Sequence, residues 1–446
     1  MTNSSRIKQF YKKNRGEKLD ALTKFTNLPV DQIRMLTKDG SLDFELTNLF
    51  IENAIGSFPM PFGICTNFKI DNSDYLLPMA VEESSVIAAT SNAAKIVYHS
   101  GGFTTKTIES LMIGQVYLID FDPKITSELK NSILDEKQNL IDSANDLFPR
   151  LVQRGGGAKD IKVKLIENKK INFNTLQIHL FVDTKDAMGA NIINTMCEGI
   201  APIIEQITKQ KALLKILSNL ASEQLYYAKC EIDFDLLATK EIDGEIIAKD
   251  IVNAYLIADN DPYRATTHNK GIMNGVDPII IATGNDWRAI EAGAHAYASI
   301  TGRYRSLSKW QIKNNKLIGE ITLPLQIGTV GGVTRLHPIA KLSLQILNQP
   351  KSDTLSRVIC CAGLAANLAA LRALVSTGIQ KGHMRMHAKN VALLSGAEGK
   401  EIEVIASQLV INKKINVANA EIILKKLREG NINYSKSKKE YIDNLI

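Results

Sequence analysis

The feature that most constrains this fold is the order of apolar segments between residues 113 and 219. Segments with strand-like patterns and segments with helical spacing follow one another as strand, helix, strand, strand, helix, strand. The triplet Gly155–Gly157 separates the first helix from the second strand. This is the order of a ferredoxin-like βαββαβ unit, and it predicts a small domain spanning 112–219. The expected segments are Gln115–Phe121, Ser127–Asp146, Ile161–Ile166, Leu176–Val182, Ala187–Ile207 and Leu213–Leu217.

The residues on either side of this unit have a different composition. Segments 1–111 and 220–377 are rich in small residues and helix formers, and Leu364–Ser376 has the helical period of a tightly packed central helix. Because 446 residues exceed what one compact core accommodates, we expect more than one domain. The sequence therefore predicts a multidomain α+β protein. Its parts are a mostly helical large domain of 1–111 and 220–377, the inserted unit, and a small helical lid of 378–446.

Composition limits where the chain works and what it binds. Hydrophobic residues make up 45% of it, yet we find no apolar run of the roughly 20 residues that cross a bilayer and no signal-peptide pattern. The five cysteines are an odd number without CxxC spacing, which argues against a disulfide framework or a zinc site and favours buried, inert thiols. We therefore expect a cytoplasmic protein without a membrane span or a bound metal.

The net charge of +7 is concentrated toward the two ends of the chain. Nucleic acid is one partner for such a surface, but no DNA-binding signature or aromatic-rich basic motif accompanies the charges, so none is expected. A phosphorylated coenzyme would be attracted by the same field. For any single lysine, a solvated basic surface is the simpler interpretation. The basic side chains of the N-terminal segment are Arg6, Lys8, Lys12, Lys13, Arg15 and Lys18.

Residues 183–191 lie where a strand gives way to a helix, and they read Asp-Thr-Lys-Asp-Ala-Met-Gly-Ala-Asn. Backbone N–H groups at a helix start bind anions, and small residues allow a pyrophosphate to approach closely. The absence of GxGxxG argues against a Rossmann site. By spacing alone, Asp186 is better explained as the N-cap of the following helix.

Residues 261–275 combine polar and glycine residues with little helical or strand periodicity, which is typical of a binding loop. This stretch contains Lys270, and the next polar stretch, 282–288, contains Asp286. An aspartate beside a lysine stabilises the ammonium charge, which can then stabilise an oxyanion. The alternative is a surface ion pair together with a helix cap at Asn285 or Asp286.

Two further groups carry acid–base chemistry in principle. Glu82 and Glu83 are adjacent carboxylates, of which one could act as a general acid, although two solvated glutamates in a first helical turn are the alternative. His383 and His387 are four residues apart and share a helix face, but no HExxH motif or nearby acidic ligand supports a metal site. Spacing alone does not distinguish metal binding from proton transfer on a mobile segment.

Taken together, these segments are far more specific than any one of them. Their order resembles that of the class II (bacterial, soluble) 3-hydroxy-3-methylglutaryl-CoA (HMG-CoA) reductases, and the resemblance covers nearly the whole chain. The matching motifs are Glu52-Asn53-Ala54-Ile55-Gly56, Val81-Glu82-Glu83, Asp186-Ala187-Met188-Gly189-Ala190-Asn191, His268-Asn269-Lys270-Gly271, Gly284-Asn285-Asp286-Trp287-Arg288 and Gly382-His383-Met384.

The resemblance implies an activity and a catalytic set. The activity is reduction of the HMG-CoA thioester by two hydride transfers to mevalonate and free CoA, a step of the mevalonate pathway of isoprenoid biosynthesis. Lys270 is expected to stabilise the oxyanion and Asp286 to orient that lysine. Glu83 is expected to act as the general acid, and His383 to protonate the departing CoA thiolate.

The same resemblance implies binding residues and an assembly. Ser85, Arg264 and Asn274 match positions that hold the hydroxymethylglutaryl group, where Arg264 could fork onto its carboxylate. The inserted domain is expected to bind the dinucleotide. The active site is expected to lie between the two subunits of a homodimer, which could be part of a larger assembly. On the coenzyme side, the matching residues are Asp186, Met188, Gly189, Asn191 and Asn219.

One departure bears on the coenzyme. An NADH-preferring member of the family has an acidic residue near the end of the first helix of this domain, where this chain has Phe148. Without that carboxylate, and with Arg150 and Arg154 close by, the site would accommodate a 2′-phosphate. We therefore expect NADPH as the coenzyme, with NADH as the alternative.

Two other functions compete with this one. A CoA-dependent acyl transferase or thiolase-like enzyme needs an activated cysteine, and none of the five cysteines lies near the glutamate or histidine motifs. A degenerate CoA-binding protein would bind ligand without turnover, and the complete set of expected catalytic residues argues against it.

Overall fold

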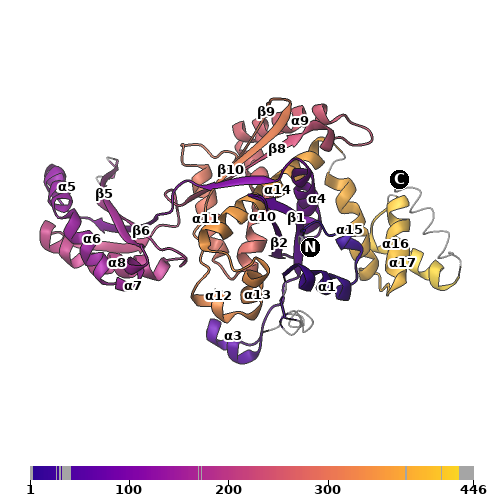
Figure 1. Cartoon of the computed structure of the whole chain (residues 1–446), viewed down its shortest axis with the longest axis horizontal. Coiled ribbons are helices and arrows are strands. Elements are labelled where there is room, and N and C mark those ends of the chain that lie inside the picture. The colour runs from indigo at the N-terminus through magenta and orange to yellow at the C-terminus, as the bar shows by residue number, and fades with distance from the viewer. Residues whose placement is uncertain are drawn as a thin grey trace.

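The computed structural model describes residues 4–26, 28–29, 32, 42–168, 170–171, 173–376, 379–412 and 414–430, with side chains left out for 379–386. Figure 1 shows a central body with a long sheet, a smaller sheet-and-helix unit on one side, and a helical bundle on the other. We call the smaller unit the insert and the helices near the C-terminus the C-terminal bundle. Each of the three has its own hydrophobic cluster.

A six-stranded sheet runs through the central body in the order β2-β1-β3-β8-β10-β9. All neighbouring strands are antiparallel except β1 and β3, which meet at a single parallel pair. Along β8, Ala228, Cys230 and Ile232 are buried, whereas the residues between them face outward. None of these strands was expected from the sequence. Their bounds are Phe62–Ile70 (β1), Ser73–Ala80 (β2), Phe103–Thr107 (β3), Leu225–Asp233 (β8), Ser308–Lys313 (β9) and Lys316–Pro324 (β10).

Helices cover the inner face of this sheet, and α14 (Ser352–Val375) lies at their centre, against α4, α9, α10 and strands β3, β8 and β10. The expected central helix is therefore present. Among the described residues, α14 alone is long and apolar enough to span a membrane, but 67% of its most apolar window is buried inside the protein. The other long helices here are Val86–His99 (α4), Gly244–Asn260 (α9), Pro262–Ala282 (α10), Trp287–Ala298 (α11) and Pro338–Ile346 (α13).

Shorter elements border the central body, and several belong to the N-terminal part of the chain. α1 packs its buried Leu22 with Leu76 of β2 and with residues of α13 in a small separate cluster. The shorter elements are Phe10–Lys12 (η1), Arg15–Thr26 (α1), Phe44–Phe50 (α3), Phe234–Leu236 (η4) and Gly332–Leu336 (α12).

The insert confirms the expected ferredoxin-like topology. Its four strands are antiparallel throughout and lie in the order β5-β6-β4-β7. Several boundaries differ from the expected ones: the first strand begins at Met112, the first helix is divided at Glu136, the second strand begins at Gly157, and the second helix begins at Ala190. The elements are Met112–Leu118 (β4), Pro123–Ile125 (η3), Thr126–Asp135 (α5), Lys137–Asp146 (α6), Pro149–Gln153 (α7), Gly157–Asn168 (β5), Phe173–Asp183 (β6), Ala190–Thr208 (α8) and Ala212–Leu217 (β7).

The C-terminal bundle consists of α15 (Ile379–Leu394), α16 (Lys400–Ile411) and α17 (Val417–Arg428). Arg428 at the end of α17 pairs with Glu401 at the start of α16, with 2.9 Å between its Nε and Oε1. The expected boundary between 377 and 378 lies outside the described residues.

The expected binding loop at 261–275 is wrong, because these residues form the first two thirds of α10. Asp261 caps the helix through backbone N–H groups of Tyr263 and Arg264, and Pro262 occupies its first turn. The glycines that suggested a loop have another cause. At Gly275 a Cβ would lie 2.3 Å from the Ala362 carbonyl oxygen of α14, so glycine permits the two helices to approach.

This contact predicts opposite effects of alanine at two neighbouring glycines. Gly275→Ala should lower the free energy of unfolding by about 1–3 kcal/mol, because α10 and α14 must move apart. Gly271→Ala is the matched control, since its Cβ would meet the Ala370 Cβ at 3.7 Å, an ordinary contact. There, alanine should stabilise the helix by about 0.5–1 kcal/mol. Chemical denaturation measures both, and equal effects would contradict the role of Gly275.

Candidate active site

An ion pair joins two residues that are far apart in the sequence. The Lys270 Nζ lies 2.6 Å from the Glu83 Oε2. Lys270 belongs to α10, and Glu83 lies in the turn between β2 and α4. Their side chains are 58% and 37% exposed. Because an exposed pair contributes only about 0–1 kcal/mol to stability, this arrangement is better explained by chemistry at the site than by folding.

The turn that presents Glu83 has an unusual backbone conformation. Ser85 has a φ of 74°, in the left-handed region that residues other than glycine rarely adopt. It stands at the N-cap of α4, yet its side chain makes no capping hydrogen bond. The Ser85 hydroxyl, two residues from Glu83, is therefore not used to start the helix.

Two of the three residues that were expected to bind substrate, Arg264 and Asn274, lie on α10 together with Lys270. Asn274 is half-buried and lies one helical turn after Lys270, so the two share a face. Arg264 lies in the first turn, where burial lowers the pKa of its guanidinium. One helix therefore positions three of the expected residues.

Asp286 occupies the N-cap of α11. Its Oδ1 accepts hydrogen bonds from the backbone N–H groups of Arg288 and Ala289, at 3.1 and 3.2 Å. No hydrogen bond or ion pair joins Asp286 to Lys270 within the residues that the structure describes. The single chain thus shows the helix cap, whereas the pair of Asp286 with Lys270 stays a prediction.

The residues expected on the coenzyme side form the turn from β6 into α8. The N-cap of α8 is Gly189, with a φ of 98°, and a Cβ there would lie 2.5 Å from the Thr184 Cγ2. The expected N-cap at Asp186 is therefore wrong. The Asp186 Oδ1 instead accepts a hydrogen bond of 2.9 Å from the backbone N–H of Ser352, which ties the insert to the start of α14.

The remaining residues of the coenzyme group differ in exposure. Met188 is half-buried and touches Gly328, where a Cβ would lie 2.5 Å from the Met188 backbone nitrogen. Asn191 is exposed in the first turn of α8, and Asn219 is exposed after β7. A Cβ at Gly293 of α11 would lie 2.6 Å from the Asn219 carbonyl oxygen, so α11 approaches this part of the chain closely.

A segment that the sequence reasoning missed connects the coenzyme turn to the loop of Asp286. The backbone N–H of Gly328 donates to the Asn285 Oδ1 at 2.8 Å, and that of Thr329 donates to the Asp186 carbonyl at 2.8 Å. Residues 328–330 thus form a strand-like stretch that contacts both the coenzyme turn, at Asp186, and the loop before Asp286, at Asn285. The signal in the sequence was its three glycines, at 328, 331 and 332.

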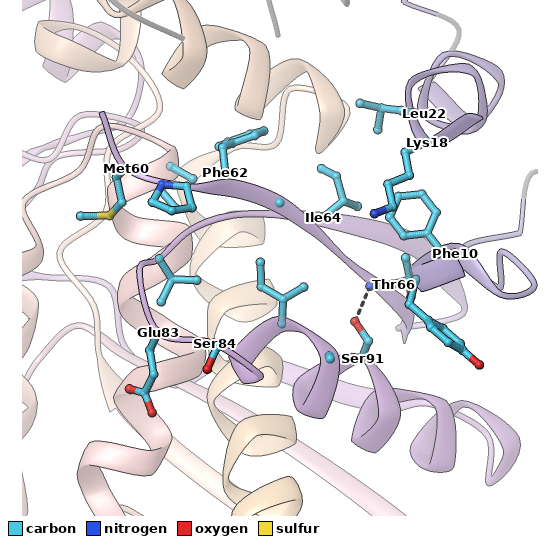
Figure 2. A pocket seen from close by; sticks show the side chains of 18 of the residues that line it. Phe10, Lys18, Leu22, Met60, Phe62, Ile64, Thr66, Glu83, Ser84 and Ser91 are labelled. Carbon is cyan, nitrogen blue, oxygen red and sulfur yellow. Dashed lines mark hydrogen bonds between the residues drawn. The ribbon is translucent and has the colours of Figure 1, made fainter. Parts of the chain in front are cut away.

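A cavity of about 1830 Å³ opens beside Glu83, between β1, α4 and the N-terminal segment. Figure 2 shows Glu83 and Ser84 at one end, with Phe10 and Lys18 at the other. Apolar side chains such as Phe62 and Ile64 form the wall between these ends. Among the described residues that line it, the only carboxylates are Glu82 and Glu83, and the Lys and Arg side chains are Arg6, Lys8, Arg15, Lys18 and Lys95.

A buried polar network holds α10 near Lys270. The His268 Nε2 lies 2.8 Å from the Ser308 Oγ of β9 and 3.1 Å from the Asn367 Nδ2 of α14. Burial lowers the pKa of His268 to about 3, so the ring is neutral. Next to it, Asn269 donates to the Arg305 carbonyl and accepts from the Leu307 N–H. Both side chains therefore set the position of α10 against its neighbours.

The other acid–base candidates are less defined. His383 lies in α15, but its side chain is outside the described residues, and His387 is exposed. All five cysteines are buried, and burial raises the pKa of Cys65, Cys197 and Cys230 to about 12. Such thiols are poor nucleophiles, which weakens the acyl-transferase alternative.

Comparisons with known proteins settle the family. The family model described as hydroxymethylglutaryl-coenzyme A reductase matches residues 14–388. The chain is also 46% identical to the 3-hydroxy-3-methylglutaryl-coenzyme A reductase of Archaeoglobus fulgidus, over 95% of each chain.

The chain belongs to the hydroxymethylglutaryl-coenzyme A reductase family.

Within this family, a probable HMG-CoA reductase of Borreliella burgdorferi is 37% identical, over 86% of this chain and 88% of its own. The HMG-CoA reductase of Streptococcus pneumoniae superposes with a TM-score of 0.80 at 41% identity, covering 94% of this chain and 99% of its own. A second structure of that class II enzyme, bound to NADPH in open conformations, superposes with a TM-score of 0.79 and covers 83% of this chain. The family and the mixed α+β fold expected from the sequence are thus confirmed.

Proposed function

We propose that this protein is a cytoplasmic, NADPH-dependent HMG-CoA reductase. The observation that carries the proposal is the ion pair of Lys270 and Glu83, which stands at one end of a cavity with a cationic far end. In the reaction, one hydride and one proton reduce the thioester carbonyl to a hemithioacetal. The C–S bond then breaks to give CoA thiol and an aldehyde. A second hydride and proton reduce that aldehyde to the alcohol of mevalonate.

Lys270 and Glu83 have complementary roles at the reacting carbonyl group: one stabilises negative charge and the other donates a proton. Each hydride addition places negative charge on the substrate oxygen, and a fixed ammonium stabilises it. Glu83, when its carboxyl group is protonated, can then deliver that proton to the oxygen. The 2.6 Å contact keeps the ammonium and the carboxyl group within reach of the same atom.

The remaining catalytic roles rest on the motifs. Asp286 orients Lys270 and holds its proton, and His383 protonates the CoA thiolate so that it does not add back to the aldehyde. Residues 378–446 act as a lid that keeps the aldehyde from escaping. Asp286 begins α11, and residues 328–330 link its loop to the coenzyme turn.

The hydroxymethylglutaryl group is assigned to residues beside this pair. Arg264 presents a planar guanidinium suited to a carboxylate, and Asn274 follows Lys270 by one turn. The Ser85 hydroxyl, which caps no backbone group, is free to contact the substrate. All three positions lie on elements that also position the ion pair.

The cavity suits the CoA portion of the substrate. Its apolar wall matches the thin, uncharged arm of the coenzyme, and its basic end matches the phosphates. With the phosphates at the N-terminal segment, the thioester would reach the Glu83 end. On this proposal, the basic N-terminal residues that line the cavity bind the phosphates of CoA and are more than a solvated basic surface.

The insert, 112–219, is proposed to bind the dinucleotide through Asp186, Met188, Gly189, Asn191 and Asn219. Two observations support NADPH over NADH. Phe148, which replaces the acidic residue, packs against the core of the insert, and Arg150 and Arg154 are exposed beside the glycine triplet. The class II structure similar to this chain was solved with NADPH.

A homodimer with shared active sites is also proposed. Residues 51–60 expose apolar side chains to a degree that a single chain does not explain: Ile55 is 99% and Phe58 is 92% exposed. This stretch lies just before β1, and its Phe58 and Met60 line the cavity together with Phe62 and Ile64 of β1. A second copy covering this stretch would complete the site.

The dimer predicts an effect of charge in this stretch. Phe58→Asp should convert the dimer to a monomer, because a buried carboxylate opposes association. Light scattering measures the mass. Ile171→Asp, in the exposed β5–β6 hairpin and 70% exposed, is the control and should leave the mass unchanged. A wild-type monomer, or a dimeric Phe58→Asp variant, would exclude this interface.

The reductase activity predicts consumption of NADPH when HMG-CoA is present, read as loss of NADPH absorbance, with slower consumption of NADH. Lys270→Ala should lower kcat by at least about 100-fold, because removing an oxyanion donor costs that much. The loss should extend to added mevaldehyde, since both hydride steps need the ammonium. Lack of turnover with either coenzyme would refute the function, and an active Lys270→Ala variant would refute the role of the lysine.

The cavity predicts that only some basic residues affect substrate binding. Lys18→Glu should raise the KM for HMG-CoA about tenfold and leave kcat within about twofold, because it weakens a phosphate contact remote from the chemistry. Lys12→Glu is the matched control, since Lys12 belongs to the same basic segment but does not line the cavity. Steady-state kinetics at fixed ionic strength measure both. Equal effects would mean a diffuse field rather than a bound coenzyme.

A further inference from the structure

Two carboxyl groups meet behind the loop that carries Asp286. Asp277 belongs to α10 and Glu291 to α11, and their side chains are hydrogen-bonded to each other. The Asp277 Oδ1 is buried and has no hydrogen-bond partner among the described residues. Neither residue has a role in the proposed reaction.

The contact continues into a chain of hydrogen bonds. The His295 Nε2 lies 2.7 Å from the Glu291 Oε2, and its Nδ1 lies 2.7 Å from the Tyr304 hydroxyl. The rings of His295 and Tyr304 are stacked, with centroids 5.9 Å apart. Burial raises the pKa of Tyr304, and the Asn269 amide opposes that shift. Asn269, the neighbour of Lys270, also donates its Nδ2 to the carbonyl of Arg305, the residue after Tyr304, at 2.8 Å. The chain therefore leaves α10 at Asp277, passes through α11 and returns to α10 at Asn269.

The Asp277–Glu291 contact requires a proton, because two ionised carboxylates in contact would repel each other. Burial, together with the hydrogen bond to Glu291, raises the pKa of Asp277. The hydrogen bond from His295 lowers the pKa of Glu291. The proton therefore resides on Asp277, which donates it to an ionised Glu291.

The hydrogen-bonded series contacts α10 at Asn269 and at Asp277, on either side of two proposed active-site residues. Lys270 and Asn274 lie between Asn269 and Asp277, and Glu291 follows Asp286 by five residues on α11. We propose that Asp277, Glu291, His295 and Tyr304 are positioning residues whose shared-proton chain sets the register of α11 on α10, and so of Asp286 relative to Lys270. This inference rests on the proposed reductase function.

The positioning acts through geometry alone. Hydrogen bonds between an acid and a carboxylate are short and directional, and therefore hold two helices in one relative placement better than apolar contacts do. A displacement of about 1 Å between reacting groups can cost about 100-fold in rate. Asp277, Glu291, His295 and Tyr304 therefore need not touch the substrate: the loss of any one of them can slow the reaction by displacing Asp286 from Lys270.

The test compares two substitutions at Asp277. Asp277→Asn keeps a donor toward Glu291, whereas Asp277→Leu has the same branching and number of heavy atoms but no donor. We expect Asp277→Asn to stay within about twofold of the wild-type kcat. Asp277→Leu should lose at least about tenfold in kcat, with the KM for HMG-CoA within about threefold, because the chemistry and not the binding is misaligned.

A second variant and a control complete the test. His295→Phe keeps a ring beside Tyr304 but cuts the chain, and should reproduce the kcat loss of Asp277→Leu. Glu245→Gln breaks a similar i,i+4 pair, with Lys249 on the surface of α9, and should change nothing. Thermal melting of each variant, with kinetics measured well below its Tm, separates misalignment from unfolding.

The outcomes are distinct. Equal kcat values for Asp277→Asn and Asp277→Leu, or a lower Tm with unchanged kcat in Asp277→Leu, would overturn the positioning role. A wild-type protein that does not oxidise NADPH with HMG-CoA would instead overturn the proposed function. The protonated acid has its own readout: an infrared carboxylic-acid band should be present in the wild type at pH 7 and absent from Asp277→Asn. A spectrum without it would overturn the shared proton.

Discussion

The close contact of α10 with α14 is the constraint on which the rest of the site depends. Gly275 lets the backbones of the two helices meet at Ala362, and α14 is itself buried at the centre of the main core. α10 carries Lys270 together with both flanking residues assigned to the substrate. A helix held this firmly cannot rotate or slide, so the backbone of Lys270 has one position. The neutral His268 network and the Asn269 contacts reinforce the same placement with directional bonds.

The site combines this rigid helix with exposed partners. In the single chain, the Lys270–Glu83 pair is open to water, where an ion pair is weak. Covering it with a second subunit or a lid would lower the local dielectric constant and strengthen the effect of the ammonium on a developing oxyanion. The exposed apolar stretch around Phe58 and the helical C-terminal bundle are the parts suited to do so.

Local periodicity and local motifs were enough for part of this fold and site. The ferredoxin-like insert was predictable because its strands and helices are short, regular and adjacent in the chain. Glu83 and Lys270 were recognisable from motif order, and the structure brings them together. The six-stranded sheet was not predictable, since its strands come from three distant parts of the sequence. The helix at 261–275 was mistaken for a loop because its glycines serve packing against α14, which no local pattern reveals.

The sequence by itself determined the types of residue available for chemistry, the order of the motifs and the alternation that builds each element. These depend on neighbours within a few positions. Only the tertiary structure decided that Asp186 ties the insert to α14 rather than capping α8, and that Asp277 of α10 and Glu291 of α11 come into contact. It also decided that the basic N-terminal segment closes a cavity ending at Glu83. Each of these depends on contacts between distant segments, whose distances and burial arise only when the cores pack.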